Sequence, residues 1–217
     1  MKRIALVAAL LAGALTLTWA QAKPTTLRIV GEGVTAQIAF EKGVRMTLTS
    51  KPVPIRPDTY WTQSLSLFKK DEKGRTWELR DNGVFGSLAN VTVEAEQEKV
   101  LLLGKPVAVV VEAKPAEDPA GTPVLAVSVA VRGLSSECFL PGAFADGKPM
   151  TMPNVVIKDE AGKTLASGRC EMREKRYGWF AWRYPAGFKA KYDVDVEVFM
   201  GPFEFKPTKT LTPMEKP

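Results

Sequence analysis

The residues best suited to bind a ligand form an aromatic run near the C-terminal end of the sequence. Residues 177–184 read Tyr-Gly-Trp-Phe-Ala-Trp-Arg-Tyr. Because successive side chains of a strand point to opposite faces, a strand here would place Tyr177, Trp179 and Arg183 on one face. The opposite face would carry Phe180, Trp182 and Tyr184.

This run has two interpretations. In the first, Tyr177 and Trp179 form an exposed platform, flanked by Arg176 and Arg183, that stacks on a sugar ring or seats a peptide. Trp182 belongs to the same candidate site. In the second, which we favour, the face with Trp182 packs into a core and Trp179 lies under a loop, because aromatic residues on strands mostly serve packing.

Histidine is absent from the 217 residues. This excludes Ser-His-Asp and Cys-His nucleophile pairs, an imidazole general base and histidine-ligated zinc or haem. A glycosidase-type carboxylate pair is the remaining catalytic scheme, but no spacing selects two of the 24 Asp and Glu residues. No Gly-rich phosphate loop or Ser-x-x-Lys motif is present. We therefore expect no enzyme, and keep a carboxylate-dependent glycoside hydrolase as a disfavoured alternative.

Acidic residues alternate with valines near the C-terminal end. Asp193, Asp195 and Glu197 would line one face of a strand, and residues 94–98 repeat this pattern with Glu at every second position. Calcium takes about 6–8 oxygen ligands, usually from a loop, and a flat strand does not make its side chains converge. We interpret both stretches as solvated outer faces, and expect neither a metal nor a cofactor.

Cys138 and Cys170 are the only cysteines. In an exported protein two thiols within one module are candidates for a disulfide, which would stabilise the fold by about 3–4 kcal/mol in the chain-entropy model. This is the interpretation we favour. The alternative is two separate buried thiols that act as small hydrophobic side chains. A redox role is not expected, because the spacing is not Cys-x-x-Cys.

The first 22 residues have the organisation of a cleaved signal peptide. Lys2 and Arg3 precede an apolar run over residues 4–17, and Ala-Gln-Ala at 20–22 fits a signal peptidase site. The run is shorter than the roughly 20 residues of a membrane-spanning helix, so we expect no stable span after cleavage. The sequence therefore predicts an exported protein, periplasmic or extracellular.

The remaining sequence predicts short strands and no convincing helix. Val, Thr and aromatic residues alternate with polar ones, with a period of two, between Gly, Pro, Asn and Asp. The predicted strands are Ala36–Phe40, Arg45–Ser50, Ser64–Phe68, Thr76–Leu79, Val91–Glu94, Val107–Val111, Val124–Val131, Lys163–Ser167 and Tyr192–Phe199. Without crossover helices, this pattern predicts an all-β protein of antiparallel sheets packed face to face.

We divide the chain into two β-sandwich modules, residues 23–104 and 105–207, followed by a flexible tail at 208–217. The boundary is placed near Gly104-Lys105-Pro106, and the Pro-rich stretch 114–123 is either a linker or a long hairpin loop. Lys-Asp-Glu-Lys-Gly-Arg-Thr at 70–76 recurs as Lys-Asp-Glu-Ala-Gly-Lys-Thr at 158–164. Glycine at this position favours a tight hairpin turn, so the echo indicates either duplicated modules or a turn that arose twice.

Two stretches resemble known accessory modules. Lys-Pro-Val-Pro-Ile-Arg-Pro-Asp-Thr-Tyr at 51–60 resembles the sheet edge of prealbumin-like and carboxypeptidase-regulatory-like modules, where a turn precedes a packed tyrosine. The hairpin Ile157–Ser167, with Asp159 and Gly162 at its turn, is similar to those of bacterial immunoglobulin-like modules. The resemblance implies an accessory or adhesive β-sandwich protein, often without catalytic residues, and assigns no site residue.

These observations predict a non-catalytic, envelope-associated binding or structural protein. A carbohydrate-binding module would expose Tyr177, Trp179 or Trp182, with Tyr60 and Trp61 as a second candidate; an interaction module would offer a free sheet edge. Envelope polysaccharide or another exported protein is the expected partner. The formal net charge is +6, but the basic residues are spread along the chain, so no nucleic-acid partner is expected.

Overall fold

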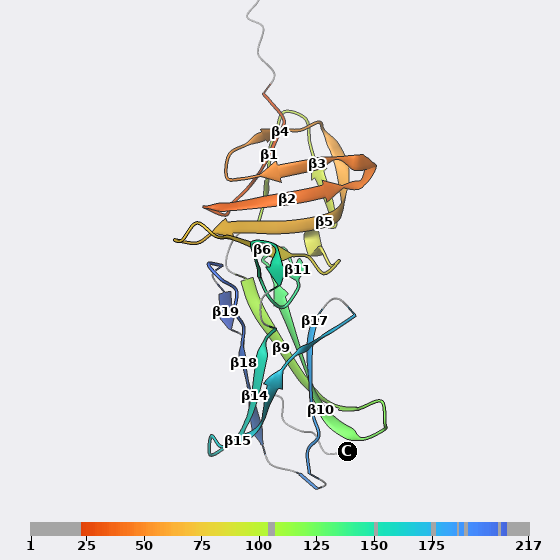
Figure 1. The fold of residues 1–217 in the computed structure, drawn as a ribbon. Helices are drawn as coiled ribbons and strands as arrows, with labels where there is room; N and C mark the ends of the chain where they lie inside the picture. The colour runs from red at the N-terminus through yellow and green to blue at the C-terminus, as the bar shows by residue number, and fades with distance from the viewer. Residues whose placement is uncertain are drawn as a thin grey trace, which may run out of the picture.

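The protein is all-β. The computed structural model describes residues 23–103, 107–149, 152–174, 177–185, 187–188, 191–203 and 205–207. Over these residues the chain forms strands β1 to β19 and two short 3-10 turns, η1 (Glu41–Gly43) and η2 (Gly86–Leu88), arranged as two stacked bodies of sheet (Figure 1). The prediction of an all-β protein with antiparallel sheets is confirmed. The predicted signal peptide and tail lie outside the described residues.

The first body contains two sheets. The smaller sheet has the order β4-β1-β8, with strands β1 (Thr26–Ile29), β4 (Val53–Pro54) and β8 (Glu98–Leu101). The larger has the order β13-β12-β6-β5-β2-β3, and β7 pairs with the first part of β5. Its strands are β2 (Val34–Phe40), β3 (Arg45–Leu48), β5 (Asp58–Lys70), β6 (Thr76–Arg80), β7 (Asn90–Val93), β12 (Phe144–Ala145) and β13 (Lys148–Pro149). All these pairs are antiparallel except β1 with β8.

The second body also contains two sheets. One has the order β16-β17-β10-β9-β19 with β11 beside β10, and the other has the order β15-β14-β18. The first is built from β9 (Val107–Glu117), β10 (Pro123–Arg132), β11 (Cys138–Phe139), β16 (Glu171–Arg173), β17 (Tyr177–Trp182) and β19 (Phe205–Pro207). The second is built from β14 (Asn154–Asp159), β15 (Thr164–Arg169) and β18 (Tyr192–Glu197). The chain passes between these sheets from β15 to β16, back from β17 to β18, and again from β18 to β19.

Each body has its own hydrophobic core, as the alternation of side chains dictates. In β2, for example, Val34, Ala36, Ile38 and Phe40 are buried while the residues between them are not. The first core also receives side chains from the second half of the chain, namely Val131, Phe139, Ala143, Met200 and Phe203. The second core gathers Val109, Val111, Leu125, Val127, Val129, Val155, Ile157 and Val194 with their neighbours.

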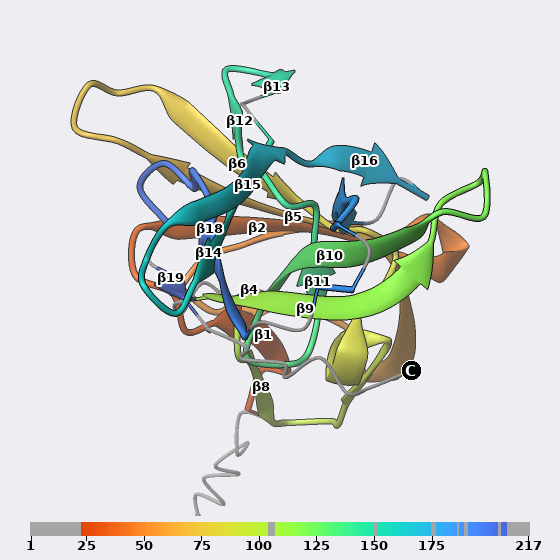
Figure 2. The same cartoon turned by 90° about the horizontal axis from the view of Figure 1, so that it is seen from below.

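The two bodies are joined by more than the chain connection. After β10 the chain returns to the first body, where Asp81 forms a β-bridge with Phe139 and β12 pairs with β6. The backbone N–H of Ser87, in η2, donates to the carbonyl of Ser135 over 2.8 Å. Figure 2 shows β12 beside β6 at the edge of the large sheet. Residues 138–145, assigned by sequence to the second module, therefore pair with strands of both bodies, and the division into two separate modules stays a prediction.

Three hairpins share one turn, and its chemistry explains the sequence echo. In the turns that begin at Asp71, Asp118 and Asp159, the aspartate Oδ1 accepts the backbone N–H groups two and four residues ahead over 2.9–3.0 Å. The glycine three residues after each aspartate has a φ between +76° and +80°. This conformation favours glycine, so Asp-x-x-Gly specifies the turn. The stretch 114–123 is thereby a hairpin and not a linker.

The disulfide prediction is corrected by the structure. Cys138 and Cys170 are both buried and both free. Cys138 lies on β11, whereas Cys170 packs into the second core at the corner between β15 and β16. Each is thus a small buried hydrophobic side chain, the alternative interpretation, and burial raises the pKa of the Cys170 thiol to about 11.

Candidate functional site

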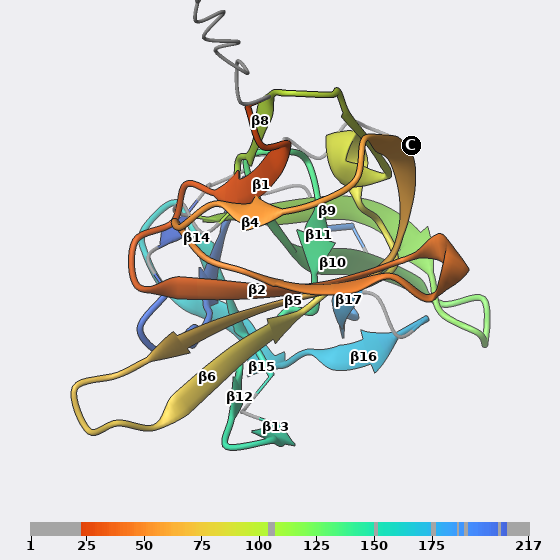
Figure 3. The same cartoon turned by 90° about the horizontal axis from the view of Figure 1, so that it is seen from above.

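A groove opens at the tip of the β5–β6 hairpin, which projects beyond the sheets (Figure 3). Its volume is about 500 Å³, and its second wall is the segment 199–202 that follows β18. We call it the lysine groove, because Lys69, Lys70 and Lys73 line it together with the aromatic residues Trp77 and Phe199. Residues more than 120 positions apart in sequence thus meet at one surface.

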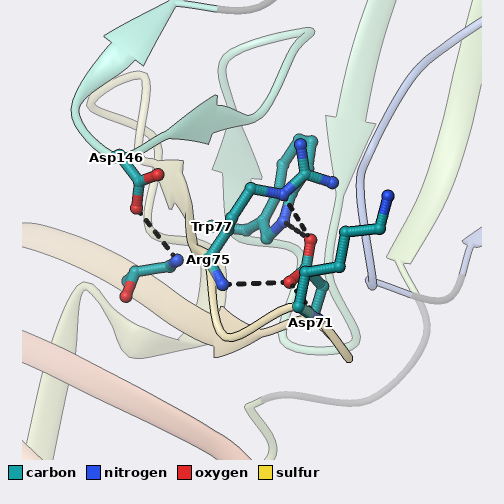
Figure 4. A network of polar contacts seen from close by, with 6 residues as sticks. Asp71, Arg75, Trp77 and Asp146 are labelled. Atoms are coloured by element: carbon teal, nitrogen blue, oxygen red, sulfur yellow. Dashed lines mark hydrogen bonds and ion pairs between the residues drawn. The ribbon is translucent and has the colours of Figure 1, made fainter.

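Asp71 is the centre of the polar network that holds this hairpin tip (Figure 4). Its Oδ1 accepts the backbone N–H groups of Lys73 and Arg75, each over 2.9 Å. Its Oδ2 accepts the Nε1–H of Trp77 over 3.0 Å and the Nε–H of Arg75 over 2.8 Å. Asp146 in turn accepts the backbone N–H of Thr76 over 3.1 Å and ties the tip to the β12–β13 turn. The tip is therefore fixed on both sides.

These hydrogen bonds keep Asp71 ionised. The Nε1–H of Trp77, followed by the backbone and side-chain donors of Arg75, lowers the pKa of Asp71 to about 2. Its charge is matched by Arg75 within the tip. Within the described chain, no ion-pair partner faces Lys69, Lys70 or Lys73. Because Glu72 is the one further acid among the lining residues, the groove carries a net charge of two positive units.

Aromatic rings form the apolar part of the groove. Trp77 lies directly opposite Lys69 in the β5–β6 ladder and is only 2% exposed. The rings of Trp77 and Phe199 meet edge to face, with centroids 5.5 Å apart, and the Arg75 guanidinium lies 5.3 Å from the Trp77 ring centroid. Phe199 is 54% exposed. The groove therefore combines cations with one open aromatic surface on a rigid base.

Replacing Trp77 by Phe tests the role of the indole in this network. Phenylalanine keeps an aromatic ring but has no N–H donor, so the pKa of Asp71 is expected to rise from about 2 toward its ordinary value. The wild-type contribution of Asp71 to stability is present above pH 4 and is lost as pH falls through the folded-state pKa. Carboxyl-carbon NMR titration measures the change, and an unaltered pKa would contradict the assigned hydrogen bond.

The aromatic run forms β17 and divides between two faces, as its spacing predicts. Phe180, Trp182 and Tyr184 pack against the second core, and Trp182 meets Phe188 edge to face with centroids 5.1 Å apart. Trp182 is therefore a packing residue in the structure, on the face away from Tyr177. The structure does not bring it to the platform side of the strand.

The platform face of β17 is half-buried. Tyr177 and Trp179 are neighbours, with ring centroids 6.5 Å apart, and the guanidinium of Arg173 lies 4.2 Å from the Trp179 ring centroid. The Nε1 atom of Trp179 is buried without a hydrogen-bond partner. Arg183 donates to Asp118 in the β9–β10 turn, and Arg176 lies outside the described residues. Arg173, from the neighbouring strand β16, thus takes the flanking position.

The second aromatic candidate, Tyr60 and Trp61, consists of one buried and one exposed ring. Tyr60 is buried, stacks near Phe40 and donates its hydroxyl to the carbonyl of Arg56 over 2.7 Å. Trp61 is 51% exposed and lies away from the lysine groove. The acidic stretch of β18 faces cations, since Lys158 donates to Asp195 over 2.8 Å. The part of the chain that the structure describes holds no group of three potential metal ligands.

Sequence reasoning missed two features, the lysine groove and Glu137. Glu137 lies between β10 and β11, is 1% exposed, and has an Oε2 atom without a partner. Burial raises its pKa to about 7, against the lowering effect of the backbone N–H groups of Glu137 and Ser135. It does not line the lysine groove. The three lysines within five residues are a sequence signal for the groove, but its second wall has none.

Comparison with protein-family models, with curated proteins and with solved structures gives no match to this chain. Among the described residues, no helix is long and apolar enough to cross a membrane.

Proposed function

We propose that this chain is an exported, non-catalytic binding protein of the cell envelope, built from two β-sandwich modules of the immunoglobulin-like or prealbumin-like kind, and that it takes anionic ligands in the lysine groove. The export signal in residues 1–22 and the separate hydrophobic cores support the first part. The observation that carries the second part is three lysines without ion-pair partners among the described residues, two at the end of β5 and one in the hydrogen-bonded turn that follows.

Electrostatics favours a polyvalent ligand. Each exposed lysine contributes only about 0.5 kcal/mol to a salt-screened ion pair, so a single anionic group would bind weakly. A polymer with repeated anionic groups engages several lysines at once, and its binding weakens as salt concentration rises. Because Asp71 and Arg75 neutralise one another, the neighbouring lysines are the charges available to a ligand.

The chemistry of the groove favours binding over catalysis. The chain has no histidine to act as a general base. Asp71 accepts four hydrogen bonds and has a pKa of about 2, so it is a poor proton donor or acceptor near neutral pH. Lys69, Lys70 and Lys73 are suited instead to charge recognition.

The test replaces Lys69, Lys70 and Lys73 together by Gln. Binding to sodium polygalacturonate and to inorganic polyphosphate, measured by isothermal titration calorimetry at low salt, is expected to weaken about tenfold for both polymers. The matched control replaces three exposed lysines outside the groove, Lys51, Lys99 and Lys163, by Gln. Equal weakening in the two triple variants would mean that net charge alone attracts the polymer, and would overturn the groove as the site.

The aromatic strand carries a second candidate, glycan binding at Tyr177 and Trp179. The Nε1–H of Trp179, which has no acceptor among the described residues, favours it. A sugar could reach the ring face beside Arg173 only by displacing that guanidinium. Co-sedimentation of the Trp179→Ala variant with insoluble envelope polysaccharide, after its fold is checked by circular dichroism, separates this candidate from the lysine groove. Unchanged binding of this variant would exclude the strand as the sugar site.

A further inference from the structure

Phe199 is the one feature of the lysine groove that charge recognition does not explain. It is 54% exposed, although large apolar side chains are normally covered, and it belongs to a groove wall. Its edge-to-face contact with the buried Trp77 fixes its position. An exposed ring held rigid beside cations is a surface for a ligand that has both an apolar face and an anionic group.

Anionic sugars have this combination. A pyranose ring offers a face of C–H groups to an aromatic side chain, and a carboxylate or sulfate on the same ring carries the charge. Lys69 lies opposite Trp77 in the strand ladder, so its charge and the ring of Phe199 both border the same indole. Free phosphate and polyphosphate match the lysines but have no apolar face for Phe199.

Resting on the function proposed above, we infer that the lysine groove recognises a polysaccharide with anionic sugar rings, one ring stacked on Phe199 and its acid groups on Lys69, Lys70 and Lys73. Phe199 then supplies selectivity for a sugar acid over other anions, while the lysines supply the attraction shared by all polyanions. Substitution of the lysines should therefore weaken the binding of every polyanion, whereas substitution of Phe199 should weaken the binding of anionic polysaccharides alone.

The surroundings favour a glycan over a single-stranded nucleic acid. Nucleic-acid grooves combine a continuous basic track with several stacking rings. Here Phe199 is the exposed ring among the described lining residues, since Trp77 is buried. A single exposed ring offers a stacking surface to one sugar ring and not to a run of bases.

The experiment compares Phe199→Ala with Leu134→Ala, which removes another exposed apolar side chain outside the groove lining. Calorimetric titrations use the purified full protein with polygalacturonate, its neutral methyl ester, a sulfated dextran, inorganic polyphosphate and a single-stranded oligonucleotide. Phe199→Ala is expected to weaken binding of the carboxylated or the sulfated polysaccharide about tenfold and to leave polyphosphate binding unchanged. Leu134→Ala is expected to change neither, and circular dichroism checks both folds.

The outcomes separate this inference from the function on which it rests. If the three lysine substitutions weaken every polyanion but Phe199→Ala weakens none, the groove is an anion site without sugar recognition, and the inference is overturned while the proposed function stands. If the oligonucleotide binds more tightly than the anionic polysaccharides and depends on Phe199, the ligand is a nucleic acid and the inference is wrong. If no polyanion depends on the lysines, the proposed function itself fails.

Discussion

Replacing Glu137 by Gln is expected to raise the free energy of unfolding at pH 8 by about 3 kcal/mol and to remove a fall in stability as pH rises. The native carboxyl has a pKa of about 7, whereas in an unfolded chain it is near 4.5. Each pKa unit corresponds to about 1.4 kcal/mol. Because glutamine is neutral at every pH, the variant no longer carries a buried negative charge above pH 7.

The geometry around Glu137 explains why ionisation is unfavourable there. The side chain lies over Gly133, where a Cβ atom would stand 1.9 Å from Oε1, so glycine makes room for the carboxyl group. The backbone N–H groups of Ser135 and Glu137 favour the charged form but do not offset burial. Oε2 has no partner. A protonated carboxyl is therefore the stable native form in acid solution.

The sign of the pH dependence follows from the raised pKa. Between about pH 4.5 and 7 the native state holds a proton that the unfolded chain has lost, so stability falls with pH in this window and levels off above it. Urea unfolding at pH 5, 6, 7 and 8 measures the slope. The exposed Glu112→Gln is the matched control, expected to keep the wild-type slope. A Glu137→Gln variant with that same slope would show that another group titrates.

Local patterns predicted the strands because they need only neighbouring residues. Each of the nine predicted segments falls on an observed strand, since alternation marks a half-buried surface and Asp-x-x-Gly closes hairpins. The Pro-rich stretch was ambiguous for a physical reason. Proline is typical of loops, yet Pro115 lies in β9 opposite Leu125 of β10, at a position without a β19 partner among the described residues, where a strand edge tolerates proline.

The arrangement of the sheets could not be predicted in the same way. Alternation says which side chains are buried, but not which sheet a strand joins. The chain changes sheets at Cys170, and this corner separates the thiol of Cys170 from Cys138 on β11. Two cysteines in a chain with a predicted export signal favour a disulfide, but both thiols are free in the structure.

The sequence indicates only one of the two walls of the lysine groove. Lys69, Lys70 and Lys73 are close in sequence, and the echo of their turn marked it as a hairpin tip. Phe199 had been placed at the end of a predicted strand with no assigned role. Only the fold brings the segment after β18 against Trp77, because that contact joins residues from both bodies. Residues 177–184 contain the highest density of aromatic side chains in the sequence, but most of these rings pack against the second core.

Replacing Gly201 by Ala is expected to destabilise the protein by about 3 kcal/mol, because two costs meet at this residue. Gly201 has a φ of +60°, which costs an L-residue roughly 1–2 kcal/mol. A Cβ atom there would also lie 2.4 Å from the Trp77 ring, and such overpacking costs about 1–3 kcal/mol. The close approach of backbone to ring therefore requires glycine.

The matched control for this substitution is Gly33→Ala, since Gly33 has a similar φ of +66° and open space where a Cβ would be. Urea unfolding is expected to show about 1 kcal/mol for Gly33→Ala and the larger loss for Gly201→Ala. The double variant Gly201→Ala/Trp77→Leu separates the two costs. The smaller leucine side chain relieves the clash with the added Cβ atom. The double variant is therefore expected to lose less stability than the sum of the losses in the two single variants. Equal losses at Gly201 and Gly33, with additive behaviour toward Trp77, would mean that the segment after β18 does not lie tightly on the indole. The wall of the groove that carries Phe199 would then lack the rigidity on which its ligand contact depends.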